Sequence, residues 1–320
     1  MAIFFHILGY NIGPIFLLII LGFILGKKFN IDILSLSKLN IYLLMPAFVF
    51  YSLYTTNIGL DMLKVLFCCM LLLACNDMIG RMISKIRHHN SGLTNAFKNS
   101  IMFNNSGNIG LSLITLVFAS TPYVIDGQTP YLHEAITAQI MIMLFQNTTS
   151  NTLGFFNAGR AKLNVKDSLR KVLFMPAIYA IPSALLLKNI GFNLHETMVW
   201  PVLEYLKNAL VPVVLITLGV QLAKTKFDFG NVDVHISVFT RLIMGPILAI
   251  IGVYLFGFTG VIAQTLFIAY AVPTAVNTAL IAVECDSCPE FASQSVMMST
   301  LFSAVTLTGA IYIARTIFPV

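Results

Sequence analysis

Charged residues are scarce in this sequence. Of its 320 residues only 10% are Asp, Glu, Lys or Arg, whereas 58% are hydrophobic, and the mean hydropathy is +0.86. A soluble domain carries about 25% charged residues, so the composition excludes that class and predicts an all-α integral membrane protein. At about 20 apolar residues for each crossing, a chain of this length has room for about ten helices.

Cysteines and catalytic motifs are also few. Three of the five cysteines, Cys68, Cys69 and Cys75, fall in one apolar stretch, where a free thiol behaves as a small hydrophobic side chain. Cys285-x-x-Cys288 is a lone pair, which is weak support for a metal or redox site. No HExxH occurs, and the run from Gly110 to Leu113 lacks the second glycine of a GxSxG turn. We therefore expect no bound metal, no cofactor and no enzymatic activity.

Ten stretches of suitable length and hydropathy follow one another along the chain. The first has no basic segment before it and no small-residue cleavage site, so we expect it to stay as a helix and not to be removed as a signal peptide. The predicted spans are 11–26, 36–55, 62–80, 95–118, 132–156, 171–188, 201–222, 236–257, 261–283 and 291–318.

The basic residues indicate an orientation. If the N-terminus lies outside, the loops after the odd-numbered spans are cytoplasmic, and cytoplasmic loops collect Lys and Arg. Those loops and the adjoining helix ends hold 15 of the 19 basic residues: Lys27, Lys28, Lys38, Arg81, Lys85, Arg87, Lys98, Arg160, Lys162, Lys166, Arg170, Lys171, Lys224, Lys226 and Arg241. We expect a multi-pass protein of the cell membrane with both termini extracellular. The basic residues of the cytoplasmic loops then account for the net charge of +6, and we expect no nucleic-acid partner.

The second half of the chain repeats the pattern of the first. Pro46 interrupts the second span as Pro212 interrupts the seventh, and Asn108 matches Asn277, each pair about 165 residues apart. Five spans in each half is an odd number, so the second half must enter the membrane from the opposite side. The prediction is an inverted 5 + 5 repeat, with 1–157 as the first five-helix repeat, 158–170 as a cytoplasmic linker and 171–320 as the second repeat.

Two of the apolar stretches are interrupted by polar residues. The run from Asn104 to Gly110 holds three Asn side chains and two glycines, and the stretch 261–283 is broken by Pro273, with Thr274 and Asn277 beyond it. Hydrocarbon offers no partner for a free N–H or C=O, so irregular backbone at that depth is tolerated only inside the protein or along a wet cavity. Two interrupted segments at corresponding places in two halves point to the binding site of a transporter.

These two segments resemble the crossover helices of the auxin efflux carrier family, and the later run Ser299-Thr300-Leu301-Phe302-Ser303 is similar as well. The family includes plant auxin carriers and bacterial permeases for malate and malonate. The resemblance covers essentially the whole chain. It implies a scaffold of helices 1, 2, 6 and 7, a moving domain in which helices 4 and 9 are broken and cross, and an elevator-like carrier of a carboxylate. A homodimer through the scaffold would fit the family.

The resemblance also suggests roles for individual residues. Asn105 takes the place of the substrate-facing Asn, with Thr274 as its counterpart in the second half. Asn104 stands where plant members carry the crossover proline, so the first break lacks a proline, whereas Pro273 keeps the second. The substrate-binding residues expected at the two breaks are Asn104, Asn105, Asn108, Pro273, Thr274 and Asn277.

Ionisable and polar residues outside the breaks give further candidates. Asp77 is the one carboxylate expected within a helix, and Arg81 lies one turn further on, near the end of its span. Such a pair is either an interfacial ion pair or a group that couples transport to protons; some plant members have an acid–base pair at this spacing. Gln139 and Gln146 lie seven residues apart on one face of the fifth span. By the resemblance Gln146 lies near the substrate, and Ser52 is expected to close the cavity from the scaffold side.

The sequence leaves alternatives to a simple organic-anion carrier. A sodium- or proton-coupled symporter or antiporter of the bile-acid-symporter type shares the crossed-helix plan, although neither 104–113 nor 271–280 holds the carboxylate that an antiporter needs. A membrane sensor on the same fold that transports nothing is a further alternative. The partners expected are a small organic anion and the lipid bilayer.

The predicted topology can be tested by thiol labelling. In a variant without native cysteines, Asp126→Cys should react with an impermeant maleimide in intact cells, because the loop is expected outside, and Asn164→Cys should react only after permeabilisation. Reaction of the Asn164→Cys variant in intact cells would contradict the orientation.

Overall fold

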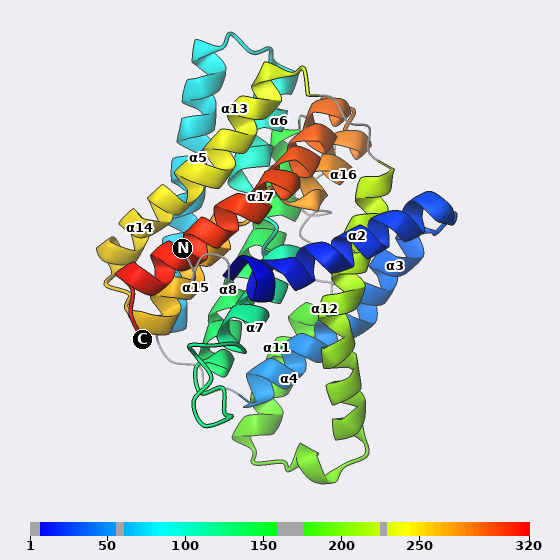
Figure 1. The fold of residues 1–320 in the computed structure, drawn as a ribbon, viewed down its shortest axis with the longest axis vertical. Helices are drawn as coiled ribbons and strands as arrows, with labels where there is room; N and C mark the ends of the chain where they lie inside the picture. The colour runs from blue at the N-terminus through cyan, green and yellow to red at the C-terminus, as the bar shows by residue number, and fades with distance from the viewer. Residues whose placement is uncertain (1–6, 56–60, 159–175, 225–228) are drawn as a thin grey trace.

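The chain forms helices throughout the part that the computed structural model describes, residues 7–55, 61–158, 176–224 and 229–320, where no β-strand occurs (Figure 1). Most of the linker predicted at 158–170 lies outside these ranges. Within them, six helices are long and apolar enough to cross a membrane: Ile7–Lys28, Ser35–Thr55, Met62–Ile86, Val199–Ala223, Val232–Phe256 and Pro289–Ile317. The prediction of an all-helical chain with membrane-spanning segments is confirmed.

The helices of the first half begin and end close to the predicted spans. They are α2 (Gly13–Lys28), α3 (Ile33–Leu39), α4 (Met45–Thr55), α5 (Asp61–Ile86), α6 (Ser91–Met102), α7 (Leu111–Phe118), α8 (Leu132–Thr149) and α9 (Phe155–Asn157). Short π-helical turns continue several of them: η1 (Ile7–Ile12), η2 (Asn40–Leu44), η3 (Ser106–Gly110) and η4 (Ser150–Gly154). Helix α5 runs six residues beyond the predicted span, so Arg81 lies inside the helix. The prediction ended the span where the apolar residues end, but polar residues can continue a helix beyond the apolar layer.

The second half has a similar sequence of elements. Its helices are α11 (Pro176–Asn189), α12 (Val199–Ala223), α13 (Val232–Phe239), α14 (Gly245–Phe256), α15 (Gly260–Ala271), α16 (Val276–Glu284) and α17 (Pro289–Ile317), with a 3-10 turn η5 (Leu194–Glu196) and a π-helical turn η6 (Thr240–Met244). Helix breaks occur at both predicted places. The first separates α6 from η3 and α7, and the second separates α15 from α16.

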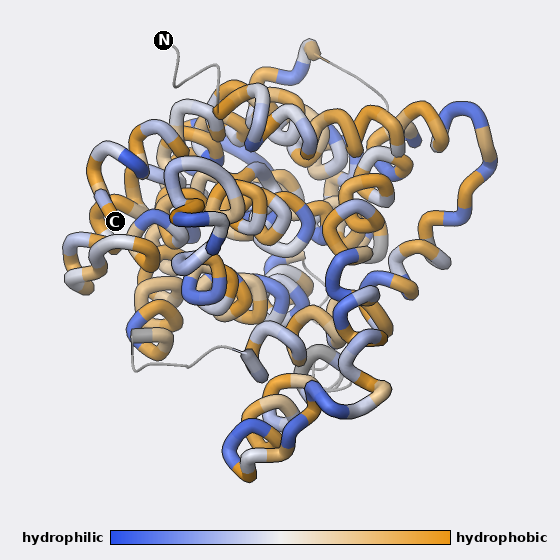
Figure 2. The backbone as a smooth tube through the Cα atoms, turned by 60° about the horizontal axis from the view of Figure 1, so that its bottom comes forward, coloured by the Kyte–Doolittle hydropathy of each residue, from blue (hydrophilic) through white to orange (hydrophobic). Residues whose placement is uncertain are grey.

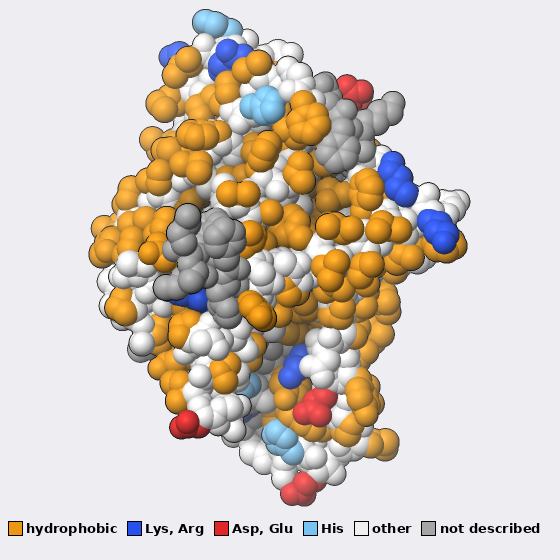
Figure 3. Space-filling view, in the orientation of Figure 1, with side chains coloured by type: hydrophobic (Ala, Val, Ile, Leu, Met, Phe, Trp, Pro, Cys, Tyr) orange, Lys and Arg blue, Asp and Glu red, His pale blue; other side chains and the backbone are white. Residues whose placement is uncertain are grey.

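The surface matches a lipid environment. Large hydrophobic side chains such as Leu17, Ile24, Phe67 and Tyr254 are more than half exposed along these helices, and hydrophobic residues follow one another along most of the backbone (Figure 2). In Figure 3 hydrophobic side chains cover the middle of the visible face, whereas Lys and Arg side chains appear mainly at its upper and right-hand ends. Exposed apolar patches of this extent mark a surface that another apolar phase covers.

One group of helices forms a closely packed scaffold. Helix α2 packs along α12, and α4 packs along α11 and α12 (Figure 1). Glycines allow the close approach of α2 and α12, because a Cβ on Gly22 would overlap the backbone of Ile216, and a Cβ on Gly219 would overlap the carbonyl of Ile19. Small residues at the contact are the usual means by which helices associate in a bilayer.

The other helices surround α15. Helices α8, α14 and α17 pack against it, and every residue of α15 from Val261 to Ala271 is buried. A 12-residue helix rises only about 18 Å, less than the roughly 30 Å of hydrocarbon, so α15 alone does not span a bilayer. The second break therefore lies at membrane depth, enclosed by protein.

The scaffold contact gives a stability prediction. Gly219→Ala should destabilise the purified protein by about 1–3 kcal/mol, the usual cost of overpacking, because its Cβ meets backbone that cannot move aside. Gly309→Ala on α17 is the matched control, since a Cβ there meets nothing within 4 Å. Thermal unfolding in detergent measures both, and equal melting temperatures for the two variants would contradict the close α2–α12 contact.

Candidate functional site

The two unwound segments lie against each other. The Asn105 N–H donates to the Pro273 carbonyl at 2.8 Å, and the Ala275 N–H donates to the Phe103 carbonyl at 2.9 Å, which forms an antiparallel bridge between Asn104 and Thr274. We call residues 103–105 and 272–275, with the helix ends that they join, the crossover. Each break thus supplies the backbone partners that the other lacks, in a region where water is scarce.

The two breaks have different local causes. Pro273 has no N–H and disfavours helical backbone in the residue before it, and Val272 is accordingly extended with ψ at 155°. The first break has no proline. There Asn105 acts as the N-cap of η3, because its side-chain oxygen accepts from the Asn108 N–H at 3.2 Å. An Asn directly after the position where the plant pattern has proline can therefore start a new helix without that proline.

Asn104 and Thr274 secure the crossover in a reciprocal way. The Asn104 Nδ2 donates to the carbonyl of Ala269, third from the end of α15, at 3.1 Å. The Thr274 Oγ1 donates to the carbonyl of Ser100, third from the end of α6, at 2.8 Å. By these bonds the counterpart of Thr274 is Asn104, and not Asn105 as the family pattern suggests. Both side chains satisfy helix-end carbonyls that would otherwise be unpaired.

A buried arginine at the crossover was not anticipated from the sequence. Arg241 was expected at a cytoplasmic helix end, but it lies within the 25-residue span Val232–Phe256 and is fully buried. Its Nη1 donates to the Ile101 carbonyl at 2.8 Å, and its Nη2 donates to the Tyr270 carbonyl. The sequence signal was its position five residues inside the eighth predicted span, which argues against a loop.

Several amide atoms beside the crossover have no hydrogen-bond partner among the described residues. They are Asn104 Oδ1, Asn105 Nδ2, Gln139 Oε1 and both Gln146 side-chain atoms, Nε2 and Oε1. All four residues are at most 4% exposed. Buried polar groups are nearly always paired, and an unpaired one costs about 1–3 kcal/mol. Donors and acceptors kept available at this cost are typical of a site for a polar ligand.

Gln146 reaches this region from α8. One face of this helix runs along the crossover: the Gln139 Nε2 donates to the Ser106 carbonyl at 2.7 Å, and a Cβ on Gly107 would lie 3.8 Å from Met143. Further along, a Cβ on Gly154 would contact the Phe103 ring. Gln146 lies between these contacts and seven residues after Gln139, on the same face. The Gln139 side chain is bonded to the backbone of η3, whereas the Gln146 side chain has no hydrogen-bond partner among the described residues.

The remaining predicted residues lie at varying distances from these amides. Asn108 and Asn277 are half-buried in the first turns of η3 and α16, one on each side of the crossover. Pro273 is buried and provides a carbonyl to the bridge. Ser52 is buried on α4, and among the described residues no hydrogen bond joins it to the crossover.

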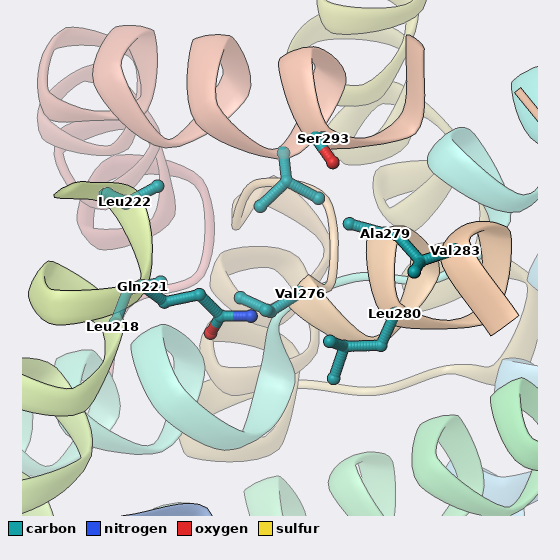
Figure 4. Close-up of a pocket in the computed structure, with 9 residues that line it drawn as sticks. Leu218, Gln221, Leu222, Val276, Ala279, Leu280, Val283 and Ser293 are labelled. Carbon is teal, nitrogen blue, oxygen red and sulfur yellow. The ribbon is translucent and has the colours of Figure 1, made fainter. Parts of the chain in front are cut away.

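A small cavity of about 90 Å³ lies between α12 of the scaffold and the helices α16 and α17, and none of the predicted substrate-binding residues lines it. Figure 4 shows its walls: Leu218, Gln221 and Leu222 from α12, Val276, Ala279, Leu280 and Val283 from α16, and Ser293 from α17. Val276 is the first residue of α16, and no side chain caps this helix. The Thr278 N–H bonds to the Ala275 carbonyl at 3.1 Å, which leaves the N–H groups of Val276 and Asn277 as the helix N-terminal donors that favour an anion.

Asp77 has two cationic partners. Its Oδ2 lies 2.6 Å from the Arg81 Nε, as the i,i+4 spacing predicts, and its Oδ1 lies 2.7 Å from the Lys98 Nζ on α6. The Lys98 side chain is 4% exposed, whereas that of Arg81 is 66% exposed. Lys98 also donates to Asn157 Oδ1 at 3.3 Å, so the pair ties α5 to α6, the helix that leads into the crossover.

Asp77 is not the one carboxylate within a helix, contrary to the expectation. Glu204 lies in α12, where it accepts from the Trp200 indole N–H at 3.1 Å. This acid lies on the scaffold, whereas Asp77 lies against the half-helix α6. Asp61, Glu134, Asp233 and Glu290 also lie in helices, so it is the bond to Lys98 of α6 that distinguishes Asp77, which stays a predicted coupling residue.

Comparison with known proteins agrees with this geometry. The sequence profile of membrane transport proteins matches residues 10–311. The chain belongs to this family. It is 24% identical over 306 residues to an "Uncharacterized transporter" of Methanothermobacter thermautotrophicus, covering 92% of this chain and 94% of the relative. A second "Uncharacterized transporter", from Methanocaldococcus jannaschii, is 24% identical over 283 residues, 85% of this chain and 86% of that relative.

A relative with a named substrate matches a shorter part. A "Putative malonate transporter" of Rhizobium meliloti is 29% identical over 114 residues, 35% of this chain and 36% of that relative. The family match confirms the resemblance to auxin efflux carriers, and with it a membrane transporter.

Proposed function

We propose that this protein is a secondary transporter of a small organic anion and that the anion binds at the crossover. The observation that carries the proposal is the set of buried amide atoms without partners in the described part of the chain, above all Asn105 Nδ2 and both polar atoms of Gln146. A carboxylate can accept from two such donors and from the uncapped N–H groups of α16.

The charge at the site favours an anion over a cation. Neither break contains a carboxylate, and the two helices that begin after the breaks direct their positive dipole ends toward it. The relative named for malonate supports a carboxylate as the class of substrate.

The arrangement of helices supports an elevator-like mechanism. A cavity lies between α12 of the scaffold and α16 and α17 of the other group, so the two groups face each other across it beside the first turn of α16. The two halves of the chain also repeat the same helix contacts. In the scaffold, α2 of the first half packs on α12 of the second half, and α11 of the second half packs on α4 of the first. In the other group, α5 packs on α6, and α14 packs on α15 in the same way. These pairs are those that ten helices in an inverted 5 + 5 repeat would form. We propose that the scaffold stays fixed while the other group moves, and that two copies of the chain dimerise through the scaffold. Both termini are proposed to be extracellular.

The substrate class can be tested on the purified protein. A thermal-shift screen with malonate, malate, other short carboxylates and matched amines should give stabilisation by carboxylates alone, followed by uptake of the best ligand into proteoliposomes. A protein that binds a carboxylate without moving it would be a sensor on this fold, and stabilisation by amines alone would contradict an anion site.

Replacing the unpaired amide separates binding from folding. Gln146→Met removes a buried amide that has no partner among the described residues, so the melting temperature should stay equal or rise. Substrate affinity should fall about tenfold to a hundredfold, which corresponds to the loss of a hydrogen bond to a charged group. Asn105→Ser keeps an N-cap oxygen and removes the amide donor, so it should also bind weakly while remaining folded. Isothermal titration calorimetry measures the affinities.

The control for these variants is Asn40→Ala. Asn40 is a buried amide of the scaffold whose Nδ2 donates to Thr217 Oγ1 at 3.1 Å. Its removal should lower stability and leave the affinity unchanged. Wild-type affinity in Gln146→Met and Asn105→Ser would show that both amides are structural.

We propose further that Asp77, with Arg81 and Lys98, couples transport to protons. Asp77→Asn keeps the size of the side chain and removes its charge, so both ion pairs on Asp77 are lost. Uptake by this variant should no longer vary with pH, whereas substrate binding should survive because the amides are untouched. Asp126→Asn, in an exposed loop, serves as the control. A wild-type pH profile of uptake in Asp77→Asn would leave Asp77 as an ion-pair partner only.

A further inference from the structure

Arg241 is the largest fully buried side chain of the described residues. It lies in η6, between α13 and α14, and no carboxylate forms an ion pair with it among the described residues. A buried charge without a partner is costly. Something other than an acid must therefore balance the guanidinium.

The two half-helices that end at the crossover provide the balance. Arg241 donates to Ile101 and to Tyr270, and each of these is the residue before the last of its helix, α6 and α15 respectively. A helix C-terminus carries about −0.5 elementary charge, so two such ends present about −1. One guanidinium matches this charge, and its fork can reach two carbonyls at once.

The local sequence makes room for this contact. A Cβ on Gly245, one turn after Arg241, would lie 2.7 Å from the Tyr270 carbonyl oxygen and 3.0 Å from the guanidinium carbon. Any larger residue would therefore push the guanidinium away from α15. The Arg241 Cζ also lies 6.0 Å from the centre of the Tyr270 ring, at the outer limit of a cation–π contact.

We infer that Arg241 is the fixed counter-cation of the crossover: a positioning residue that holds the carboxyl ends of both half-helices together. The place where two helix C-termini meet would otherwise attract a dissociable cation such as sodium. A tethered guanidinium fills it at all times, so the crossover needs no bound metal ion to keep its geometry. The inference depends on the proposed function only where it concerns transport.

The first test uses no substrate. Thermal unfolding of the purified protein can be followed with a thiol-reactive dye, because Cys68 and Cys69 are buried and free. Arg241→Ala should lower the melting temperature by about 5–10 °C, since two buried carbonyls lose their donor. About 10 mM methylguanidinium should restore several degrees by binding in the vacated space. Arg81→Ala, at an exposed position, should show neither the fall nor the recovery.

Two further variants keep the inference open to refutation if Arg241→Ala does not fold. Arg241→Lys retains the charge but not the two divergent N–H donors of the guanidinium. This variant should melt between wild type and the alanine variant without responding to methylguanidinium. Gly245→Ala retains the charge and displaces it, and should also melt below wild type. A wild-type melting temperature in Arg241→Ala or Gly245→Ala, or a fall in Arg241→Ala that methylguanidinium leaves unchanged, would overturn the inference.

The second test concerns sodium. The melting temperature of wild type should be the same in sodium chloride and in choline chloride, and uptake of the carboxylate found by the screen should also be equal in the two salts. A tenfold loss of uptake in choline, or a lower wild-type melting temperature there, would show a dissociable sodium site and overturn the inference. Because the melting experiments need no substrate, they stand even if the protein carries no carboxylate.

Discussion

The absence of water at membrane depth is the constraint on which the rest of this structure depends. A broken helix exposes N–H and C=O groups that hydrocarbon cannot satisfy, and this chain breaks two helices at the same place. The protein resolves both breaks with one contact, in which the backbone of each unwound segment pairs with the other, and Asn104 and Thr274 each bond to a carbonyl of the opposite half-helix. Neither break would be tolerable alone.

What remains unpaired after these bonds are counted is informative. Asn104 Nδ2 and Thr274 Oγ1 are bonded within the fold, whereas Asn105 Nδ2 and both polar atoms of Gln146 have no partner among the described residues. Stability and binding therefore make opposite demands on neighbouring residues: the fold gains when a buried amide finds a partner inside the protein, and a ligand site gains when it does not. The contrast separates residues that the sequence alone presents as one polar run.

Much of this could be read from the sequence, for physical reasons. Hydropathy sets the length of a span and proline restricts the backbone, so the helices and the two breaks were predictable from local composition. The bonding partners were not, because they depend on side chains far apart along the chain. Arg241 resembled a residue at a cytoplasmic helix end until its two carbonyl partners were known, and so did Lys98, although its buried ammonium forms an ion pair with the half-buried Asp77. Asn105 and Asn104 are adjacent and of the same type, so only the structure shows that Asn105 caps η3 whereas Asn104 bonds to a carbonyl of α15.

The bridge between Asn104 and Thr274 also has a consequence for how the protein is made. Its two segments are separated by about 170 residues of chain. At roughly 5–20 residues per second, the ribosome delivers the second segment about 10–30 s after the first. During that interval the first break is complete but has no partner, and its backbone must be solvated by water or by the insertion machinery. Insertion of the amino-terminal half into lipid is therefore provisional, and the carboxyl-terminal half completes it.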